Sequence, residues 1–464
     1  MTNVDGGALQ ADALVGFGTR HKVLVFFQID DARRFREAAG RLVAQGRLAS
    51  VREVLTHRRE GRVGHTPWIN LALSAPGLGK LGVDLADFRC NVAPGHARFP
   101  GNLYGKFKRR DAFTQGCAAR RQLLGDPGEV DAFSYKDWIV GVGDRRPHGV
   151  WLVGARARPT EVVKRLSELP GVCVLRVDWG CRSPDGRGIL GFRDGVSNQD
   201  IDICVDGQPL SVKPTVPAYD VLLGAPRPAK LGVLPFPAWA TWGSFLVYRR
   251  LLIDESAFHQ AAIDTARRLA RHDGTFHPRV KAAWVGRWPD GSSLAKHAER
   301  QPEAPDLDDE FDYRDDPQGS CCPRSAHVRK ARPRVDTITQ GGHTVTHLPR
   351  IVRRGTSYVT DDEREGLRDH GSLFLCYQSS IEEQFELIQR HWLNRYDLPE
   401  EGGGQDPIAG QAPREAHRRR LLRASVPGHG TVPFALSSFV HPTGGAYLLL
   451  PSLTGLATLL TPRS

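Results

Sequence analysis

The feature of this sequence that most constrains its fold is an internal repeat. Residues 23–35 have the pattern of a buried strand that runs into an amphipathic helix, and residues 245–258 repeat this pattern far downstream. Further strand–helix units are matched by the same pattern, namely those that start at Trp68 and Leu373, and those that start at Val150 and Tyr447. Such units form sheets that are covered by helices on one face. The repeat therefore predicts an α+β chain of two similar halves, packed with a cavity between them.

The boundary between the halves is expected in residues 180–239, a stretch rich in proline and glycine. We therefore divide the chain into an N-terminal half, residues 1–220, and a C-terminal half, residues 221–464. The second half is interrupted by residues 273–350, which show little periodicity. A loop of this length inside a compact domain is usually functional.

Composition narrows the class of protein. Of 464 residues, 40% are hydrophobic and 25% are charged, as in a soluble globular protein. No run approaches the roughly 18 apolar residues of a membrane span, and the N-terminus lacks the pattern of a secretory signal. We expect a cytoplasmic location with no membrane partner. The eight cysteines show no zinc spacing, so reduced thiols are expected in that compartment.

The net charge of +11 raises the question of a nucleic-acid partner. The strongest basic cluster, residues 417–420, follows a glycine-rich stretch, residues 400–410, so we expect the cluster to lie on an exposed loop. The remaining arginines are scattered among acidic residues, and no nucleic-acid-binding fingerprint is present. The sequence therefore predicts no nucleic-acid partner, although a positive surface attracts anionic aromatic molecules weakly.

Three segments carry residues suited to chemistry, and each also has an ordinary interpretation. In the first, Gly191 and Gly195 bracket Asp194 in a tight turn, which suits close approach of a flat ligand but also suits a common Asp-Gly turn. In the second, His327 lies among basic residues, which would keep its imidazole neutral for iron or would simply form a basic surface. In the third, an Ile-Val pair precedes Arg353, and predicts a strand that carries at least one arginine inward.

Together the three segments resemble the dye-decolourising peroxidases. That family has a Gly-x-x-Asp-Gly turn, here Gly191 to Gly195, and a Cys-Pro-x-x-Ala-His-x-Arg stretch that ends in Pro-Arg, here Cys322 to Arg334. An Ile-hydrophobic-Arg-x-Gly strand follows, here Ile351 to Gly355. The resemblance covers roughly residues 10–460. It departs from the family at Tyr358-Val359, where an aromatic residue followed by glycine is usual. It also departs at residues 180–187, a stretch that is short by comparison with the family.

The resemblance implies two ferredoxin-like halves with haem b in the second half. It implies that His327 is the axial iron ligand and that Asp194 and Arg353 lie on the opposite, distal side. The residues implied to bind the cofactor are His327, Gly191, Phe192, Arg193, Gly195, Arg329 and Phe374.

The implied reaction is peroxide-dependent oxidation of phenols, dyes or aromatic amines, with hydrogen peroxide and a small aromatic donor as partners. Asp194 would move the proton of the peroxide, and Arg353 would hold the developing negative charge. Since Arg353 would also keep Asp194 ionised, an acidic activity optimum is expected. The rival function is a haem-handling or iron-release protein without enzymatic activity, but storage needs only His327.

Several roles stay open at this level. The carboxylate that supports the axial histidine is expected on the helix 381–387, which contains Glu382, Glu383 and Glu386, or that face is simply solvated. Trp392 and Tyr377 are candidates to relay electrons from large donors that cannot reach the haem. Cys376 is interpreted as a core thiol. The histidines interpreted as surface residues are His343, His347 and His370. The oligomeric state is open.

Overall fold

The structure is a computed structural model of the whole chain. It describes residues 2–88, 90–91, 109–128, 134–197, 200–213, 216–229, 236–270, 277–334, 338–340, 343–345, 348–364, 366–398, 403–411, 421–426 and 430–461. The basic cluster at residues 417–420 and His347 lie outside these residues, as do the side chains of Cys90 and His343.

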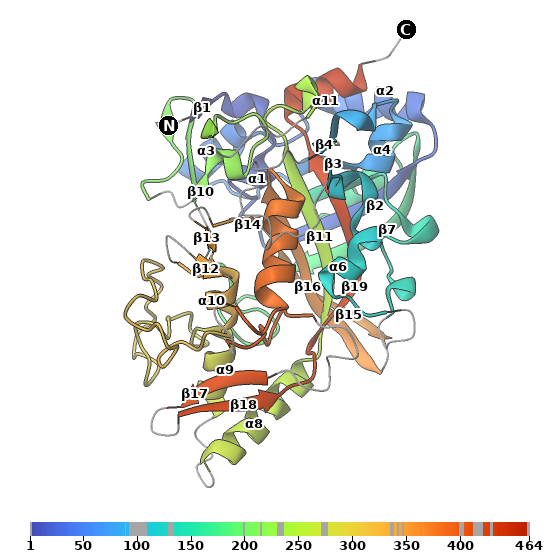
Figure 1. The fold of residues 1–464 in the computed structure, drawn as a ribbon. Coiled ribbons are helices and arrows are strands. Elements are labelled where there is room, and N and C mark those ends of the chain that lie inside the picture. Colours follow the sequence, from blue (N-terminus) through green and yellow to red (C-terminus); the bar gives the residue numbers. More distant parts are fainter. Residues whose placement is uncertain are drawn as a thin grey trace.

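Eight strands form one closed barrel at the centre of the molecule (Figure 1). The first half contributes β2 (His21–Ile29), β3 (Trp68–Ser74), β6 (Gly149–Ala155) and β7 (Val172–Cys181). The second half contributes β11 (Ser244–Ile253), β15 (Thr356–Arg364), β16 (Leu367–Gln378) and β19 (Val440–Leu450). Their order is β11-β19-β3-β6-β2-β7-β15-β16, and pairing of β11 with β16 closes the ring. The two-residue strand β14 (Val352–Arg353) adds to β16.

The two halves have the same ferredoxin-like topology. In the first half the order is β3-β6-β2-β7, and in the second it is β15-β16-β11-β19. Numbered along the chain within each half, both orders run second, third, first, fourth, and the strands pair antiparallel. The segments that start at Val23 and Phe245 therefore occupy equivalent strands, β2 and β11, as the repeat predicted.

The other two predicted matches between strand–helix units of the two halves were each wrong by one strand. The counterpart of β3 is β15, that of β6 is β16, and that of β7 is β19. The polar sequence of β15 explains the error, because its second half is largely exposed and carries no apolar run. The expected cavity between two stacked layers is also wrong. The halves join edge to edge, with Tyr358 opposite Gly180 at one seam and Leu448 opposite Ser74 at the other.

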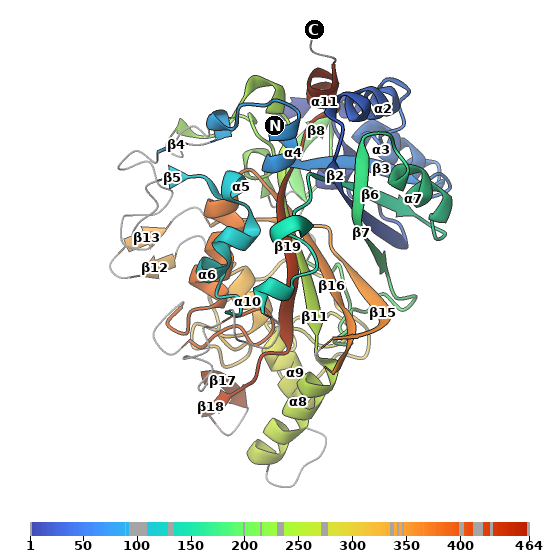
Figure 2. The same ribbon diagram turned by 90° about the vertical axis from the view of Figure 1, so that its right-hand side faces the viewer.

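Helices cover the outside of the barrel (Figure 2). They include α2 (Ala32–Ala44), α3 (Val51–Arg59), α7 (Thr160–Ser167), α8 (Glu255–Ala270), α9 (His277–Val285) and α11 (Leu453–Leu460), and the π-helical segments η10 (Ile381–Glu386) and η11 (Ile388–Leu393). Helix α2 begins where the Asp31 side chain accepts the backbone N–H of Arg34, and it buries Phe35. Helix α3 begins in the same way, with Ser50 accepting the N–H of Glu53.

Shorter elements connect this frame. The short strands are β1 (Thr2–Val4), β4 (Cys90–Asn91), β5 (Arg109–Arg110), β8 (Ile201–Val205), β9 (Gln208–Pro209), β10 (Val216–Pro217), β12 (Ile338–Gln340), β13 (His343–Val345), β17 (Leu421–Val426) and β18 (Gly430–Ala435). The short helices are η1 (Gly6–Ala8), α1 (Ala11–Leu14), α4 (Ala75–Lys80), η2 (Leu85–Phe88), α5 (Ala112–Gln115), η3 (Cys117–Arg120), α6 (Arg121–Leu124), η4 (Tyr135–Asp137), η5 (Gly143–Arg145), η6 (Ala218–Asp220), η8 (Ala238–Ala240) and α10 (His327–Ala331).

The barrel wall separates two hydrophobic cores. Along β2, Leu24 and Phe26 point into the barrel interior, whereas Val23 and Val25 point outward to the helices. Across the interior, the ring centroids of Phe26 and Tyr248 lie 4.7 Å apart, although their strands are not neighbours in the sheet. Which side of this wall a residue faces decides whether it can reach the candidate site.

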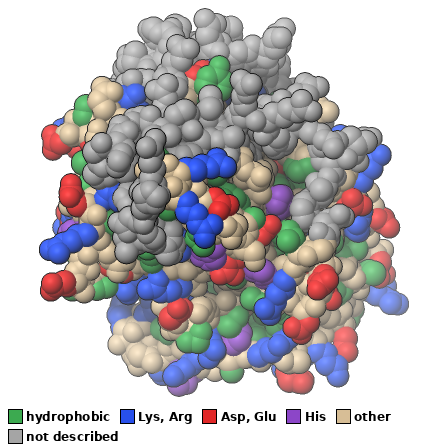
Figure 3. Space-filling view, turned by 90° about the horizontal axis from the view of Figure 1, so that it is seen from below, with side chains coloured by type: hydrophobic (Ala, Val, Ile, Leu, Met, Phe, Trp, Pro, Cys, Tyr) green, Lys and Arg blue, Asp and Glu red, His purple; other side chains and the backbone are tan. Residues whose placement is uncertain are grey.

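Helix hydropathy, cysteines and surface charge can be described for the residues that the structure covers. Among the described residues, no helix is long and apolar enough to cross a membrane. No disulfide joins any of the seven described cysteines. On the face drawn in Figure 3, basic and acidic side chains are interspersed.

Candidate active site

The candidate active site is a cavity of about 280 Å³ on the outer face of β11 and β16, beneath η10 and η11. Its walls are largely apolar, formed by residues that include Leu251, Ile253, Ile351, Phe374, Phe385 and Ile388. Polar and charged side chains also line it, and His327 and Arg353 are among them. A cavity of this kind suits a flat, mainly apolar ligand that is held at defined polar contacts.

His327 is the first residue of helix α10, and a buried carboxylate fixes its ring. The Nδ1 atom of His327 lies 2.7 Å from Oδ2 of Asp406, so Nδ1 carries the proton and donates it to that oxygen. The other oxygen, Oδ1, accepts the backbone N–H groups of Ile408 at 2.7 Å and Ala409 at 2.8 Å. Burial opposes the charge on Asp406, but His327 and these two N–H groups hold the pKa of Asp406 below its usual range. The Nε2 atom of His327 is left for a ligand.

The expectation that the helix 381–387 supplies this carboxylate was wrong. Glu386 pairs with Arg120 and accepts the hydroxyl of Tyr447, and Glu382 accepts the backbone N–H of Ala112. Asp406 comes instead from the glycine-rich stretch 400–410. Its side chain is fully buried. An Asp-Pro pair after a run of glycines was the one available signal.

Arg353 reaches the cavity from β14. Val352 pairs with Tyr377 and is buried, and Arg353 pairs with Cys376 and lines the cavity. Within the described part of the chain, no hydrogen bond or ion pair engages the Arg353 guanidinium. The neighbouring Arg354 turns the other way and donates to the carbonyls of Asp12 and Leu14. Arg353 is therefore a charged group that is available to a ligand.

Asp194 lines a second cavity, of about 440 Å³, which adjoins the first. Ile253, Arg353, Ser372 and Phe374 line both cavities, so Arg353 stands where they meet. Asp194 is exposed, and its Oδ1 accepts the backbone N–H of Gly195 at 2.8 Å. The structure thus brings Asp194 and Arg353 to one cavity and Arg353 and His327 to the other.

The turn that carries Asp194 depends on its glycines. Gly191 and Gly195 adopt φ values of +82° and +81°, a region that favours glycine. The N–H of Arg193 donates to the carbonyl of Pro289, which anchors the turn to the second half. Phe192 and Arg193 line the second cavity with Asp194, whereas Gly191 and Gly195 shape the turn without lining either cavity.

The structure places Arg329 outside both cavities. Its guanidinium donates to the Cys322 carbonyl at 2.6 Å and to the carbonyl and carboxylate of Asp316. It also stacks 4.4 Å from the ring centroid of Tyr313. These contacts hold the loop that precedes His327, and they leave Arg329 no contact with the cavity.

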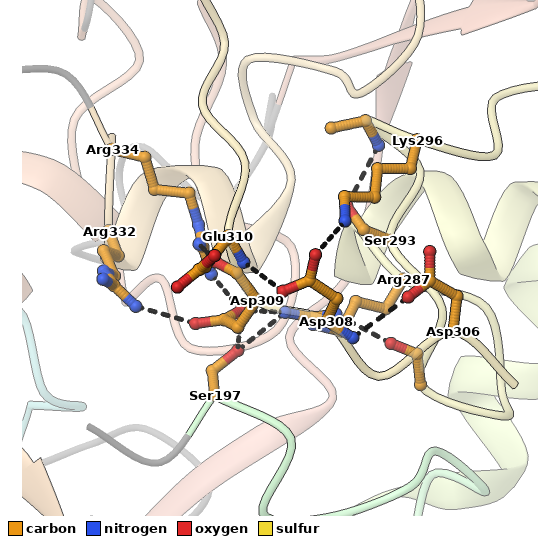
Figure 4. Close-up of polar contacts among 12 residues, drawn as sticks. Ser197, Arg287, Ser293, Lys296, Asp306, Asp308, Asp309, Glu310, Arg332 and Arg334 are labelled. Carbon is orange, nitrogen blue, oxygen red and sulfur yellow. Dashed lines mark hydrogen bonds and ion pairs between the residues drawn. The ribbon is translucent and has the colours of Figure 1, made fainter. Parts of the chain in front are cut away.

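Other arginines line the cavity in its place, around the carboxylate of Asp309 (Figure 4). Asp309 binds Arg287, Arg332 and Arg334, and it accepts the hydroxyl of Ser197 at 3.2 Å. Ser197, Arg332 and Arg334 all line the cavity. Burial, followed by repulsion from Arg334, lowers the pKa of Arg332 to about 10. One carboxylate among three guanidinium groups leaves an excess of positive charge, which an anionic ligand would compensate.

A further cavity residue, Arg249, was missed from the sequence. Its guanidinium forms a buried ion pair with Asp126, at 2.8 and 2.5 Å, and its Nη1 lies 3.3 Å from the Cys117 sulfur. In the sequence Arg249 lies within the strand that starts at Phe245, and nothing there links it to Asp126, 123 positions away. Cys376 is fully buried, as expected for a core thiol, and His370 is half-buried.

Comparison with known proteins identifies relatives over the whole chain. Two family models match, the DyP dimeric alpha+beta barrel domain at residues 8–173 and the C-terminal domain of Dyp-type peroxidases at residues 289–401. The chain is 29% identical to the multifunctional dye peroxidase DyP2 of Amycolatopsis, over 94% of this chain and 91% of that protein. It is 26% identical to the dye-decolorizing peroxidase msp1 of Mycetinis scorodonius, over 98% of this chain and 87% of that protein.

Solved structures of dye-decolorizing peroxidases superpose on nearly the whole chain. An ancestral D-type dye-decolorizing peroxidase superposes with a TM-score of 0.79 at 26% identity, covering 99% of this chain and 100% of that one. A dye-decolorizing peroxidase in complex with 2,6-dimethoxyphenol has the same fold, with a TM-score of 0.79 at 24% identity, covering 99% of this chain and 100% of that one. A deferrochelatase of Yersinia pestis is 28% identical over 46% of this chain and 40% of its own length.

Proposed function

The chain belongs to the dye-decolourising peroxidase family and is a peroxidase, and from this premise we propose that it uses haem b to oxidise phenols, dyes and aromatic amines with hydrogen peroxide. One observation carries the proposal. A histidine fixed by a buried carboxylate and an arginine with no described partner line the same apolar cavity, and an acidic residue lines the cavity that adjoins it. This is the set of groups that peroxide cleavage on an iron centre requires.

The residues of the cavity fit a haem. His327 would be the axial ligand through Nε2, because Asp406 occupies Nδ1. The apolar walls suit the porphyrin, with Phe374 and Phe385 among them. The excess of positive charge around Asp309 suits the two propionates, and Arg332 and Arg334 are placed at the cavity to meet them. Arg249 is a further cationic group in the lining.

When bound, the haem supplies an iron that binds hydrogen peroxide and accepts its oxidising equivalents. The residues of the chain transfer the proton of the peroxide and stabilise the charge that develops. Asp194 takes the proton from one peroxide oxygen and delivers it to the oxygen that leaves. Arg353 stabilises the negative charge that develops on the leaving oxygen. The apolar wall that Arg353 lines keeps the dielectric low there, which strengthens the effect of Arg353.

An absorbance spectrum recorded during peroxide addition tests this function. We expect a Soret band in the purified protein, a change of that band on addition of peroxide, and its return when 2,6-dimethoxyphenol is then supplied. Loss of the band with release of iron and no oxidised phenol would support the rival iron-release function instead. Asp194 and Arg353 favour the enzyme, because cofactor storage needs neither.

Two other expectations stay as proposals. We place the division between the halves near residue 220, ahead of β11, and the haem in the second half, whose residues form most of the cavity wall. We also keep the cytoplasmic location that the sequence predicted. A limited-proteolysis map and a fractionation experiment would test these two points separately.

The variant Asp406→Asn should lower the affinity for haem by about 10–100-fold, the usual effect of losing a carboxylate that supports a metal-bound histidine. The amide keeps the shape of the side chain but removes the charge that raises the basicity of the His327 ring. Transfer of haem to apomyoglobin, followed at the Soret band, measures the effect.

The matched control is Asp397→Asn. Asp397 lies nearby in sequence and pairs with Arg395 at 2.7 Å, but it makes no contact with His327. Equal transfer rates for Asp406→Asn and the wild type would show that Asp406 does not support the ligand.

A further inference from the structure

Four buried tyrosines of the described chain each donate a hydrogen bond to a carboxylate. The pairs are Tyr248 with Asp178 at 2.6 Å, Tyr358 with Asp369 at 3.0 Å, Tyr377 with Asp12 at 2.7 Å, and Tyr447 with Glu386 at 3.0 Å. A phenol that loses an electron becomes strongly acidic, so its oxidation inside a protein requires a proton acceptor within hydrogen-bond reach. Each pair meets that requirement, and position decides which one can take part in the peroxidase reaction.

The barrel wall separates Tyr447 from the other three. Tyr248, Tyr358 and Tyr377 belong to the core inside the barrel. Tyr447 belongs to the core outside it, together with Phe385 and with Phe374 at its edge. Tyr377, which the sequence suggested as a relay, therefore faces away from the cavity.

Aromatic contacts join Tyr447 to the cavity. Its ring centroid lies 6.4 Å from that of Phe385 in an edge-to-face arrangement, and Phe385 lies 6.1 Å from Phe374. Both phenylalanines line the cavity that we assign to haem. Tyr447 is thus one aromatic residue removed from the cavity.

The carboxylate of Glu386 lies within hydrogen-bond reach of the Tyr447 hydroxyl and is the acceptor placed to take its proton. Its Oε1 accepts both the Tyr447 hydroxyl and Nε of Arg120, the latter at 2.8 Å. Glu382 lies one helical turn earlier, and burial together with the Glu386 charge raises the pKa of Glu382 to about 7. Burial, and then the Glu386 charge, raise the pKa of Tyr447 well above its ordinary value. The resting tyrosine is therefore a protonated phenol.

We propose that Tyr447 is an internal electron donor of this peroxidase and that Glu386 is its proton acceptor. The inference rests on the proposed function, because it requires the haem to occupy the cavity. After peroxide has oxidised the cofactor by two electrons, Tyr447 donates one electron to the cofactor. The O–H bond of Tyr447 breaks, the proton moves to Oε1 of Glu386, and a neutral tyrosyl radical remains. One electron from an aromatic donor and the returning proton then restore the phenol.

Freeze-quench electron paramagnetic resonance on the haem-loaded full-length protein tests the assignment. The protein is mixed with one equivalent of hydrogen peroxide without a donor, and parallel samples contain ring-deuterated tyrosine. We expect a tyrosyl signal that narrows on deuteration and that Tyr447→Phe largely removes. The variant keeps the ring and the Glu386–Arg120 ion pair, and loses only the hydroxyl.

The matched control is Tyr248→Phe, which removes an equally buried, carboxylate-bound hydroxyl from the other side of the barrel wall. It should keep the full signal, as should Tyr358→Phe and Tyr377→Phe. An undiminished signal in Tyr447→Phe, a tryptophanyl signal in its place, or no tyrosyl signal in the wild type would overturn the inference. If Tyr447→Phe does not fold, loss of the signal in any of the three barrel-interior variants would also overturn it.

The Soret band separates this failure from failure of the proposed function. A peroxide-induced change of that band without a signal from Tyr447 refutes only the internal donor. A protein that takes up no haem, or whose haem does not respond to peroxide, refutes the function on which the donor depends.

Discussion

The variant His327→Ala is expected to bind almost no haem and to lose nearly all peroxidase activity. His327 is the one imidazole among the described residues that line the cavity, so the variant leaves the iron without a strong ligand there. Its loss also leaves the buried Asp406 carboxylate without its partner, which adds a desolvation cost. The ratio of Soret to protein absorbance after reconstitution with haem measures the effect. Partial recovery on addition of free imidazole would show that the ligand, and not the fold, was lost.

His297→Ala is the matched control for this experiment. His297 also contacts an aspartate, with Nε2 at 2.9 Å from Asp306, and its side chain is 30% exposed against 26% for His327. It does not line either cavity. The control should bind haem normally, and a wild-type Soret ratio in His327→Ala itself would refute the assignment of the ligand.

The second large effect is expected for Arg353→Leu, which should slow the reaction with hydrogen peroxide by about 10²–10³-fold. This is the typical loss when one preorganised donor to a developing oxyanion is removed. Arg353 offers a fixed charge with no described partner, whereas water can substitute for Asp194 because that side chain is exposed. Asp194→Asn should therefore lose less than Arg353→Leu. The second-order rate of the spectral change in a stopped-flow instrument gives both values.

Arg353→Lys is the informative companion variant. It keeps the charge but not the planar array of donors, so its rate should fall between those of the wild type and Arg353→Leu. If Arg353→Leu reacts at the wild-type rate while Asp194→Asn does not react, the division of roles is wrong. Asp194 would then drive the step alone.

Local patterns predicted those parts of the site that are contiguous in sequence. The Asp194 turn, the His327 segment and the strand before Arg353 each have distinctive residues, and the structure brings them to adjoining cavities. The partner of His327 could not be found in this way. Asp406 lies 79 positions away, in a glycine-rich stretch that no motif links to His327. Its burial results from tertiary packing that no local pattern encodes.

Prediction of the fold also succeeded only where a single strand has a distinctive sequence. Strands β2 and β11 were recognised because they are buried and apolar, but β15 was missed because its outer half is polar and exposed. Without β15, every later strand of the second half was matched to the wrong partner. The closure of the barrel depends on hydrogen bonds at the two seams, and backbone pairing between distant strands leaves no signature in the side chains.

The closed barrel has a consequence for how the chain can be divided. In either half alone, two strands would present unpaired backbone groups, β3 and β7 in the first and β15 and β19 in the second. Unpaired strands of this kind recruit other strands. A truncated protein that ends after β7 would therefore be prone to self-association, and two copies could restore the ring by pairing with each other. The covalent link between the halves makes that association intramolecular, so one polypeptide obtains the closed architecture that a single half would need two copies to build.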